Sequence, residues 1–235
     1  AEQLAQYDIA AFSFDKRTIA LMASGNTDEK DLVFDNFIND VKDIIANFKS
    51  KKTYRHIIIA GHSEGSLIGM VAALGNVDGF ISLAGPGRTI DLVIAEQIGK
   101  QAPNLKEEVE KNLALLKSGQ TFKLENQALS FLFRESLQPY LISWIKYDPQ
   151  IEIQKLQIPV LLINGTKDIQ VPVSDAELLK KVKPDAQLKI ITNMNHLFKE
   201  IKTDDLAENQ AAYNNPDLPI APEMVSAVNQ FIKSL

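Results

Sequence analysis

The stretch Gly61-His62-Ser63-Glu64-Gly65 decides the fold of this chain. It follows a β-branched run at residues 56–60 and precedes an apolar, helical pattern at residues 66–74. A serine at such a junction is typical of a nucleophile elbow, a turn so tight that the serine backbone is strained and its hydroxyl exposed. Glycine is expected at positions 61 and 65, because side chains there would collide. The pattern predicts that Ser63 is a nucleophile; a turn serine before a helix is the alternative.

The general base can be found by elimination among three histidines. Where a nucleophile elbow is used, the chain order is serine, then acid, then histidine. His56 precedes the serine and His62 lies inside the elbow, which leaves His196. It follows an apolar alternation at residues 188–191, as expected for a loop after a strand. We predict that His196 is the base; a structural loop histidine is the alternative.

The acid should lie between the serine and the histidine, in a loop after a buried strand. Residues 159–163 read as that strand, and residues 164–168 as its exit loop. Asp168 is therefore predicted to orient the imidazole and to stabilise the imidazolium that forms. An aspartate that only caps the turn is the alternative.

These residues imply an acyl-transfer mechanism. Ser63 Oγ would attack an acyl carbonyl while His196 takes its proton, and the backbone N–H of Glu64 would bind the oxyanion. No cofactor or metal is expected, because this chemistry needs none. His56 and His62 with the nearby acids do not form a convincing metal site.

Four stretches resemble the α/β-hydrolase superfamily, in the branch of serine esterases and proline-iminopeptidase-like peptidases. They are the Asp-x-Arg at residues 15–17, the elbow, the acid loop at residues 164–168 and the pair Asn195-His196. The resemblance covers nearly the whole chain and implies an α/β fold, with a mostly parallel sheet, helices on both faces and a helical cap insertion. The chain departs from the family at residues 18–20, where a Gly-x-Gly turn is usual. Arg17 is expected to form a structural ion pair with Asp15.

Hydrophobic periodicity predicts the elements. Strands are predicted at residues 8–14, 56–60, 79–84, 158–163 and 187–191, and helices at 31–48, 66–74, 174–181 and from 222 onward. Residues 202–219 are predicted to be loop. Strands alternating with helices indicate a mostly parallel sheet. We predict a hydrolase core from residues 1–88 and 148–235.

Residues 89–147 show only helical patterns and are predicted to form the cap insertion over Ser63. Asn104 and Glu107 are expected to form a capping box for one of its four helices. The aromatic residues of this segment are expected mostly in its core, with some facing the serine; they are Phe122, Phe131, Phe133, Tyr140 and Trp144.

Composition excludes several classes of partner. The net charge is −5 and no basic stripe appears, which argues against nucleic-acid binding. There are no cysteines, hence no disulfide framework. No apolar run is long enough to span a membrane. A soluble protein is expected, cytoplasmic or exported after processing.

The start of the chain leads to a further expectation. In the family, the strand that carries the second oxyanion donor lies between the strands matching residues 8–14 and 56–60. We therefore expect the hydrolase core to be N-terminally incomplete, with an upstream segment filling this gap, because unpaired strand edges are costly. Direct pairing of residues 8–14 with 56–60 is the alternative.

Three functions remain open. The leading one is hydrolysis of carboxylic esters with small or medium, largely uncharged acyl groups, since the insertion is rich in apolar residues. An aminopeptidase-like activity on short peptides is the first alternative, and acidic side chains would then have to hold the α-amine. A non-catalytic hydrolase-fold binding protein is the second.

Overall fold

The computed structural model describes residues 1–25 and 29–235, and these residues form two compact units. The first unit contains Ala1–Ser13, Lys42–Gly87 and Pro149–Leu235. The second contains Phe14–Val41 and Arg88–Asp148. Residues 14–41 therefore group with the helical segment, whereas the sequence placed them with the core.

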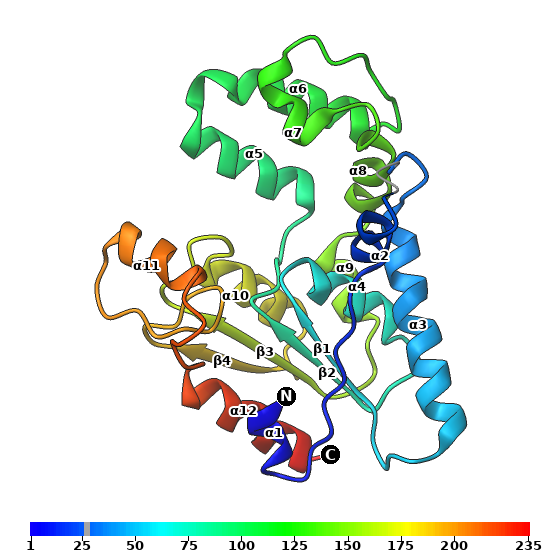
Figure 1. Ribbon diagram of the computed structural model, residues 1–235, viewed down its shortest axis with the longest axis vertical. Coiled ribbons are helices and arrows are strands. Elements are labelled where there is room, and N and C mark those ends of the chain that lie inside the picture. The colour runs from blue at the N-terminus through cyan, green and yellow to red at the C-terminus, as the bar shows by residue number, and fades with distance from the viewer. Residues whose placement is uncertain (26–28) are drawn as a thin grey trace. The chain divides into compact units, whose positions relative to one another are not determined.

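The first unit is built around a parallel sheet of four strands in the order β1-β2-β3-β4 (Figure 1). The strands are β1 (Ile58–His62), β2 (Gly79–Leu83), β3 (Val160–Gly165) and β4 (Gln187–Ile191). Every residue of β2 and β3 is buried, as expected for central strands covered on both faces. Because the strands are parallel, their carboxyl ends lie at one edge, and the loops after β1, β3 and β4 begin there. The predicted α/β class is confirmed.

Helices cover both faces of this sheet. On one face lie α4 (Glu64–Ala72), α9 (Pro149–Gln154) and α10 (Val173–Val182); on the other lies α12 (Pro222–Lys233), contacted by the short α1 (Glu2–Ala5) (Figure 1). Helix α12 is strongly amphipathic and buries Val228 and Phe231 against apolar residues of the sheet. The sheet and its two helical layers position the loops at the carboxyl edge.

The second unit is entirely helical in its described residues. It contains α2 (Arg17–Ala23), the start of α3 (Phe34–Lys51), α5 (Ile90–Gln101), α6 (Lys106–Lys117), α7 (Ser130–Phe133) and α8 (Gln138–Ile145), with 3₁₀ turns at Pro103–Leu105 and Gln127–Leu129. Its core is largely aliphatic and includes Val109, Leu116, Leu129 and the buried ring of Phe133.

Aromatic packing joins the two segments of this unit. The ring of Phe34 stacks on Trp144 with centroids 5.3 Å apart and planes 6° from parallel. The backbone N–H of Phe34 donates to Ser143 Oγ over 2.7 Å. Most of the aromatic residues of the insertion pack inside the unit, but Phe131 is 62% exposed.

Arg17 pairs with Asp40 of α3, so its predicted pairing with Asp15 is wrong. Arg17 Nε donates to Asp40 Oδ2 over 2.8 Å, and a second guanidinium nitrogen bonds the other carboxylate oxygen. The hydrogen bond to Asp40 raises the pKa of Arg17. This two-point contact fixes the start of α2 on α3.

The predicted strand at residues 8–14 is wrong. Residues 9–16 form neither helix nor strand, and most of them are exposed. A strand persists only where a neighbour accepts and donates its backbone hydrogen bonds. Within the described part of the chain β1 pairs only with β2, so the alternative of direct pairing between residues 8–14 and 56–60 is wrong as well.

Two further local predictions fail. Residues 202–219, predicted as loop, contain α11 (Leu206–Tyr213), whose N-cap Asp205 accepts a hydrogen bond from Ala207 N over 2.8 Å. The capping box of Asn104 and Glu107 is absent from these described residues, because a 3₁₀ turn precedes α6 and Leu105 is its N-cap. Hydrophobic periodicity does not detect a helix that lies in a polar segment, and it does not show at which turn a helix begins.

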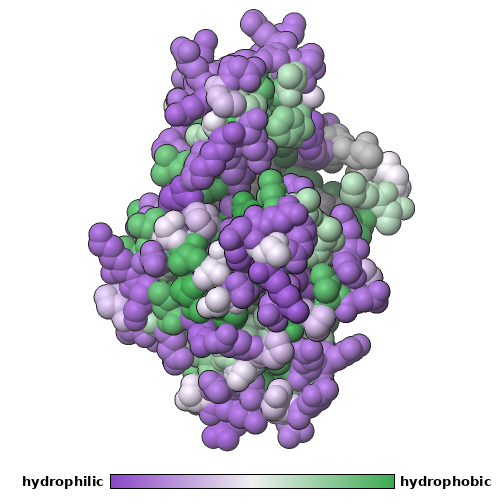
Figure 2. Space-filling view, turned by 90° about the vertical axis from the view of Figure 1, so that its left-hand side faces the viewer, coloured by the Kyte–Doolittle hydropathy of each residue, from purple (hydrophilic) through white to green (hydrophobic). Residues whose placement is uncertain are grey.

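Figure 2 shows a face on which hydrophobic residues form separate patches among hydrophilic ones. None of the helices in the described residues combines the length and the apolarity needed to cross a membrane.

Candidate active site

Ser63 lies in a strained turn between β1 and α4. Its φ of 54° and ψ of −124° are outside the regions that non-glycine residues ordinarily adopt. Its backbone N–H donates to Leu83 O over 3.0 Å, and its carbonyl accepts from Ser66 N over 2.9 Å. The turn is thus held on both sides, by the neighbouring strand and by the first turn of the helix.

The two elbow glycines have different roles. A Cβ at Gly61 would overlap the carbonyl oxygen of Gly65, so the turn requires glycine there. A Cβ at Gly65 would meet no described atom within 4 Å outside its own helix, so the predicted collision at position 65 is wrong. Gly65 already belongs to α4, where a side chain points away from the turn.

The structure brings the predicted acid and base together. His196 Nδ1 lies 2.8 Å from Asp168 Oδ2, and the two side chains are 3% and 0% exposed. The other carboxylate oxygen of Asp168 accepts from the backbone N–H groups of Gln170 and Val171, at 2.8 and 2.9 Å. Because an ionised carboxylate only accepts, Nδ1 carries the imidazole proton, and Nε2 is left as the basic nitrogen.

The loop after β4 that carries His196 (residues 192–198, the histidine loop) contacts the elbow through His62. His62 Nε2 lies 3.0 Å from the carbonyl oxygen of His196, and the two imidazole rings have centroids 4.7 Å apart. The residue directly before Ser63 therefore touches the candidate base. In the described residues no hydrogen bond joins Ser63 Oγ to His196; in hydrolases this bond often tightens only with substrate.

Glu64 is the first residue of α4. The N–H groups of the first turn of a helix have no partner within the helix, and they carry the positive end of its dipole. The backbone N–H of Glu64, the predicted oxyanion donor, therefore lies at the positive end of α4, in the residue that follows Ser63. The part of the chain that the structure describes contains no group of three or more histidine, aspartate or glutamate side chains arranged to hold a metal ion.

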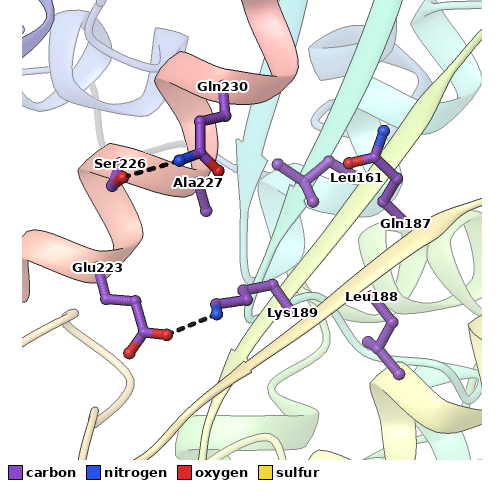
Figure 3. A pocket seen from close by; sticks show the side chains of 8 residues that line it. All are labelled: Leu161, Gln187, Leu188, Lys189, Glu223, Ser226, Ala227 and Gln230. Atoms are coloured by element: carbon purple, nitrogen blue, oxygen red, sulfur yellow. Dashed lines mark hydrogen bonds and ion pairs between the residues drawn. The ribbon is translucent and has the colours of Figure 1, made fainter. Parts of the chain in front are cut away.

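A separate groove of about 370 Å³ lies between α12 and the strands β3 and β4 (Figure 3). Lys189 and Glu223 form an ion pair across it, and Gln230 bonds Ser226 along α12. The strand residues that line it include Leu161 and Gln187, near the amino ends of their strands. Ser63, Asp168 and His196 follow the opposite ends, so this groove does not belong to their site.

Sequence reasoning missed the side chains that support the two loops. Asn195 and Asn209 are buried and bond one another behind the Asp168–His196 pair. Asn209 lies on α11, within the segment predicted as loop. The spacing Asp205-x-x-Glu208 is that of a capping box and could have indicated this helix.

Comparison with known proteins fixes the family. The family model for "Serine aminopeptidase, S33" matches residues 1–201, most of the chain. The chain belongs to the serine aminopeptidase S33 family. The resemblance to the α/β-hydrolase superfamily is thereby confirmed.

Relatives of this S33 chain include esterases. It is 28% identical over 169 residues to the esterase EstD of Thermotoga maritima, over 68% of this chain and 40% of that protein. The chain thus spans less than half of this curated relative.

Solved structures support the same fold. Est1E of Butyrivibrio proteoclasticus has a TM-score of 0.55 at 16% identity, over 96% of this chain and 84% of that one. BpoC of Mycobacterium tuberculosis, described as a putative non-heme bromoperoxidase, has a TM-score of 0.51 at 14% identity, over 89% and 77%. At such identities the likeness establishes the α/β-hydrolase fold and no activity.

Proposed function

We propose that this protein is a serine hydrolase that cleaves carboxylic esters of small or medium acyl groups through an acyl-enzyme on Ser63. The observation that carries the proposal is the buried Asp168–His196 hydrogen bond beside a serine held at positive φ. Structural aspartate–histidine pairs do occur. Here the serine lies on a strained strand-to-helix turn, and the residue before it contacts the same histidine, which supports Ser63 as the partner of this base.

In the proposed reaction, Ser63 Oγ attacks the ester carbonyl carbon while His196 Nε2 takes the hydroxyl proton. Asp168 keeps the Nδ1 proton directed at its carboxylate and stabilises the imidazolium. The protonated His196 then gives its proton to the leaving alkoxide, which releases the alcohol. His196 then takes a proton from water, which attacks the acyl-enzyme. When the acyl–Oγ bond breaks, the carboxylic acid is released and His196 returns the proton to Ser63 Oγ.

The Glu64 N–H is the proposed first oxyanion donor. It lies at the positive end of α4, next to the reacting oxygen of Ser63. Loss of one such donor typically lowers kcat about 10²–10³-fold, so a second donor is expected to contribute as much.

We place this second donor on a strand that pairs with the open edge of β1. Ala60 of β1 is exposed, and within the described residues the strand has a single neighbour. A partner segment, in this protein outside residues 1–235 or in another chain, would satisfy these backbone groups. Strong amide-exchange protection on both sides of β1 in the natural protein would support the partner segment.

The segment at residues 89–147 is proposed as the cap that selects the acyl group. This segment begins after the carboxyl end of β2. Ser63 follows the carboxyl end of β1, at the same edge of the sheet. The segment exposes the apolar side chains of Leu92 and Phe131, and an apolar surface would suit uncharged acyl chains over charged ones.

An aminopeptidase-like activity is the second candidate, and the description of the matching family favours it. Such an enzyme must hold a free α-amine by a carboxylate near the scissile bond. The proposed mechanism at Ser63 is the same for both activities, so only substrates can separate them.

The test is a parallel panel of p-nitrophenyl esters and aminoacyl-nitroanilides. We expect hydrolysis of short and medium esters, loss of activity in Ser63→Ala, and full activity in Ser226→Ala, a control at an exposed serine of α12. Faster hydrolysis of the anilides would favour the peptidase. Equal rates in the wild type and Ser63→Ala would contradict both.

A further inference from the structure

Two buried amide side chains, Asn195 and Asn209, connect the segments that carry Asp168 and His196. Asn195 is 0% exposed and Asn209 is 4% exposed. Asn195 Nδ2 donates to Asn209 Oδ1 over 3.2 Å, and Asn209 Nδ2 donates to the carbonyl oxygen of Lys167 over 2.7 Å. One side chain of α11 thus bonds a residue next to His196 and a residue next to Asp168.

Asn195 also shapes the histidine loop itself. Its Oδ1 accepts from Leu197 N and Lys199 N, at 3.0 and 2.9 Å, so the loop folds around this side chain. Both bonds use the amide oxygen and leave the amide nitrogen for Asn209. The two roles of Asn195 are therefore chemically separable.

Further contacts fasten α11 to the acid loop. Gln170 Nε2 donates to the hydroxyl of Tyr213 over 3.1 Å, and Lys167 Nζ forms an ion pair with Asp204, just before the helix. Burial raises the pKa of Tyr213, so its phenol stays neutral near pH 7.

Helix α11 buries little apolar surface. In its eight residues only Asn209 and Ala212 are buried. Burial of an amide is unfavourable unless its donors and acceptor are bonded. Asn195 and Lys167 supply these partners, so the amide at position 209 is explained by the two loops that it joins.

We propose that Asn209 is a positioning residue. It fixes the acid loop and the histidine loop relative to one another, so that Asp168 Oδ2 faces His196 Nδ1. This inference rests on the proposed function. The bridge through Asn209 adds to two direct bonds between the loops, from Lys167 N to Met194 O over 3.0 Å and from Asn193 N to Thr166 Oγ1 over 2.9 Å. A displacement of about 1 Å in a catalytic group can lower the rate about 10²-fold, so a modest loss of register is measurable.

The test uses Asn209→Ala, Asn195→Asp and the double variant. Asn195→Asp keeps the oxygen that Leu197 and Lys199 require, replaces the donor to Asn209 by a second acceptor oxygen and adds a negative charge. Gln210→Ala truncates an exposed amide on the same helix and is the matched control. Folding is checked by circular dichroism and thermal unfolding, and rates are taken well below each Tm.

We expect Asn209→Ala to lower kcat about 10–100-fold with KM changed less than about twofold. The acid limb of kcat/KM should move to lower pH, because a displaced Asp168 stabilises the imidazolium less. Asn195→Asp should also lower kcat, although its added negative charge favours the imidazolium and so opposes the shift of the acid limb. The double variant should lose less kcat than the product of the single losses, since both lose one shared bond. Gln210→Ala should behave as the wild type.

A readout independent of turnover is the downfield proton resonance of His196 Nδ1–H, assigned by its absence in His196→Gln. We expect it in the wild type and in Gln210→Ala, and expect it shifted or broadened in Asn209→Ala. If no substrate is hydrolysed but this change occurs, positioning stands and the proposed function fails. If the wild type is active and folded Asn209→Ala or Asn195→Asp retains the rate, pH profile and resonance, the positioning inference is overturned.

Discussion

Asp168 Oδ2 accepts a hydrogen bond from His196 Nδ1 over 2.8 Å, although 28 positions separate the two residues in sequence. The bond spans two loops that leave the sheet at the carboxyl ends of β3 and β4. Its burial removes water that would compete for either partner, so the bond fixes both the tautomer and the ring orientation of His196.

Replacement of the acid tests this bond. In Asp168→Asn the amide can present a donor to Nδ1, which favours the wrong tautomer and leaves the proton on Nε2. We expect kcat for p-nitrophenyl esters to fall about 10⁴-fold, the loss seen when a triad aspartate becomes asparagine. Asp217→Asn, at an exposed site, is the control. A loss below about tenfold would show that another acid orients His196.

The two elbow glycines should differ sharply when each is replaced by alanine. Gly61→Ala forces a methyl group into the carbonyl of Gly65, so we expect a loss of about 3 kcal/mol in the free energy of unfolding, with loss of activity. Gly65→Ala meets open space and should change that free energy by less than about 1 kcal/mol. Urea unfolding measures both, and equal effects would contradict the turn described here.

The cap proposal predicts a change in acyl preference from an exposed aromatic residue. Phe131→Ala removes a ring that is 62% exposed, so we expect little effect on Tm and a shift of kcat/KM toward longer acyl chains. Trp144→Ala is the contrasting variant, because its ring stacks on Phe34 and its loss should mainly lower Tm. An unchanged preference in Phe131→Ala across an ester series would count against this residue as part of the selecting surface.

The stability of the second unit should depend on pH through Glu96. Hydrogen bonds from Lys100 and Arg88 lower the pKa of Glu96 from 4.5 to about 2. A lowered pKa means that the stabilisation is complete above about pH 5, fades as the pH falls through 4.5, and is lost below about pH 2. We expect Glu96→Gln to lower Tm at pH 7 and to approach the wild type at pH 2–3. A difference in Tm that stays constant over this range would show that these contacts do not matter.

The sequence predicts the strands of the sheet and the pairing of Asp168 with His196, because buried strands and a tight elbow have strong local signals. Strand 187–191 is predicted at its observed bounds, and the elbow strand is displaced by two residues. Residues 8–14 fail because strand formation depends on a neighbour, and no pattern within the segment reveals whether that neighbour is present.

The support of the site was harder to predict. Helix α11 is short and buries only Asn209 and Ala212, so it has no apolar face to reveal it. Asn209 joins the two loops, and its partners at positions 167 and 195 are distant in sequence. The contact of His62 with His196 likewise depends on how β1 and β4 exit the sheet. Contacts of this kind arise only when distant segments come together in the fold, so no periodic pattern in the sequence predicts them.

The most direct test of the central claim is covalent labelling by a fluorophosphonate, mapped by mass spectrometry. An activated serine is phosphonylated, whereas an ordinary serine hydroxyl is not. We predict one label per protein, on the peptide that contains Ser63, with none on Ser63→Ala and normal labelling of Ser226→Ala. A folded wild-type protein that takes no label, or takes it at another residue, would contradict Ser63 as the nucleophile and favour a non-catalytic binding protein.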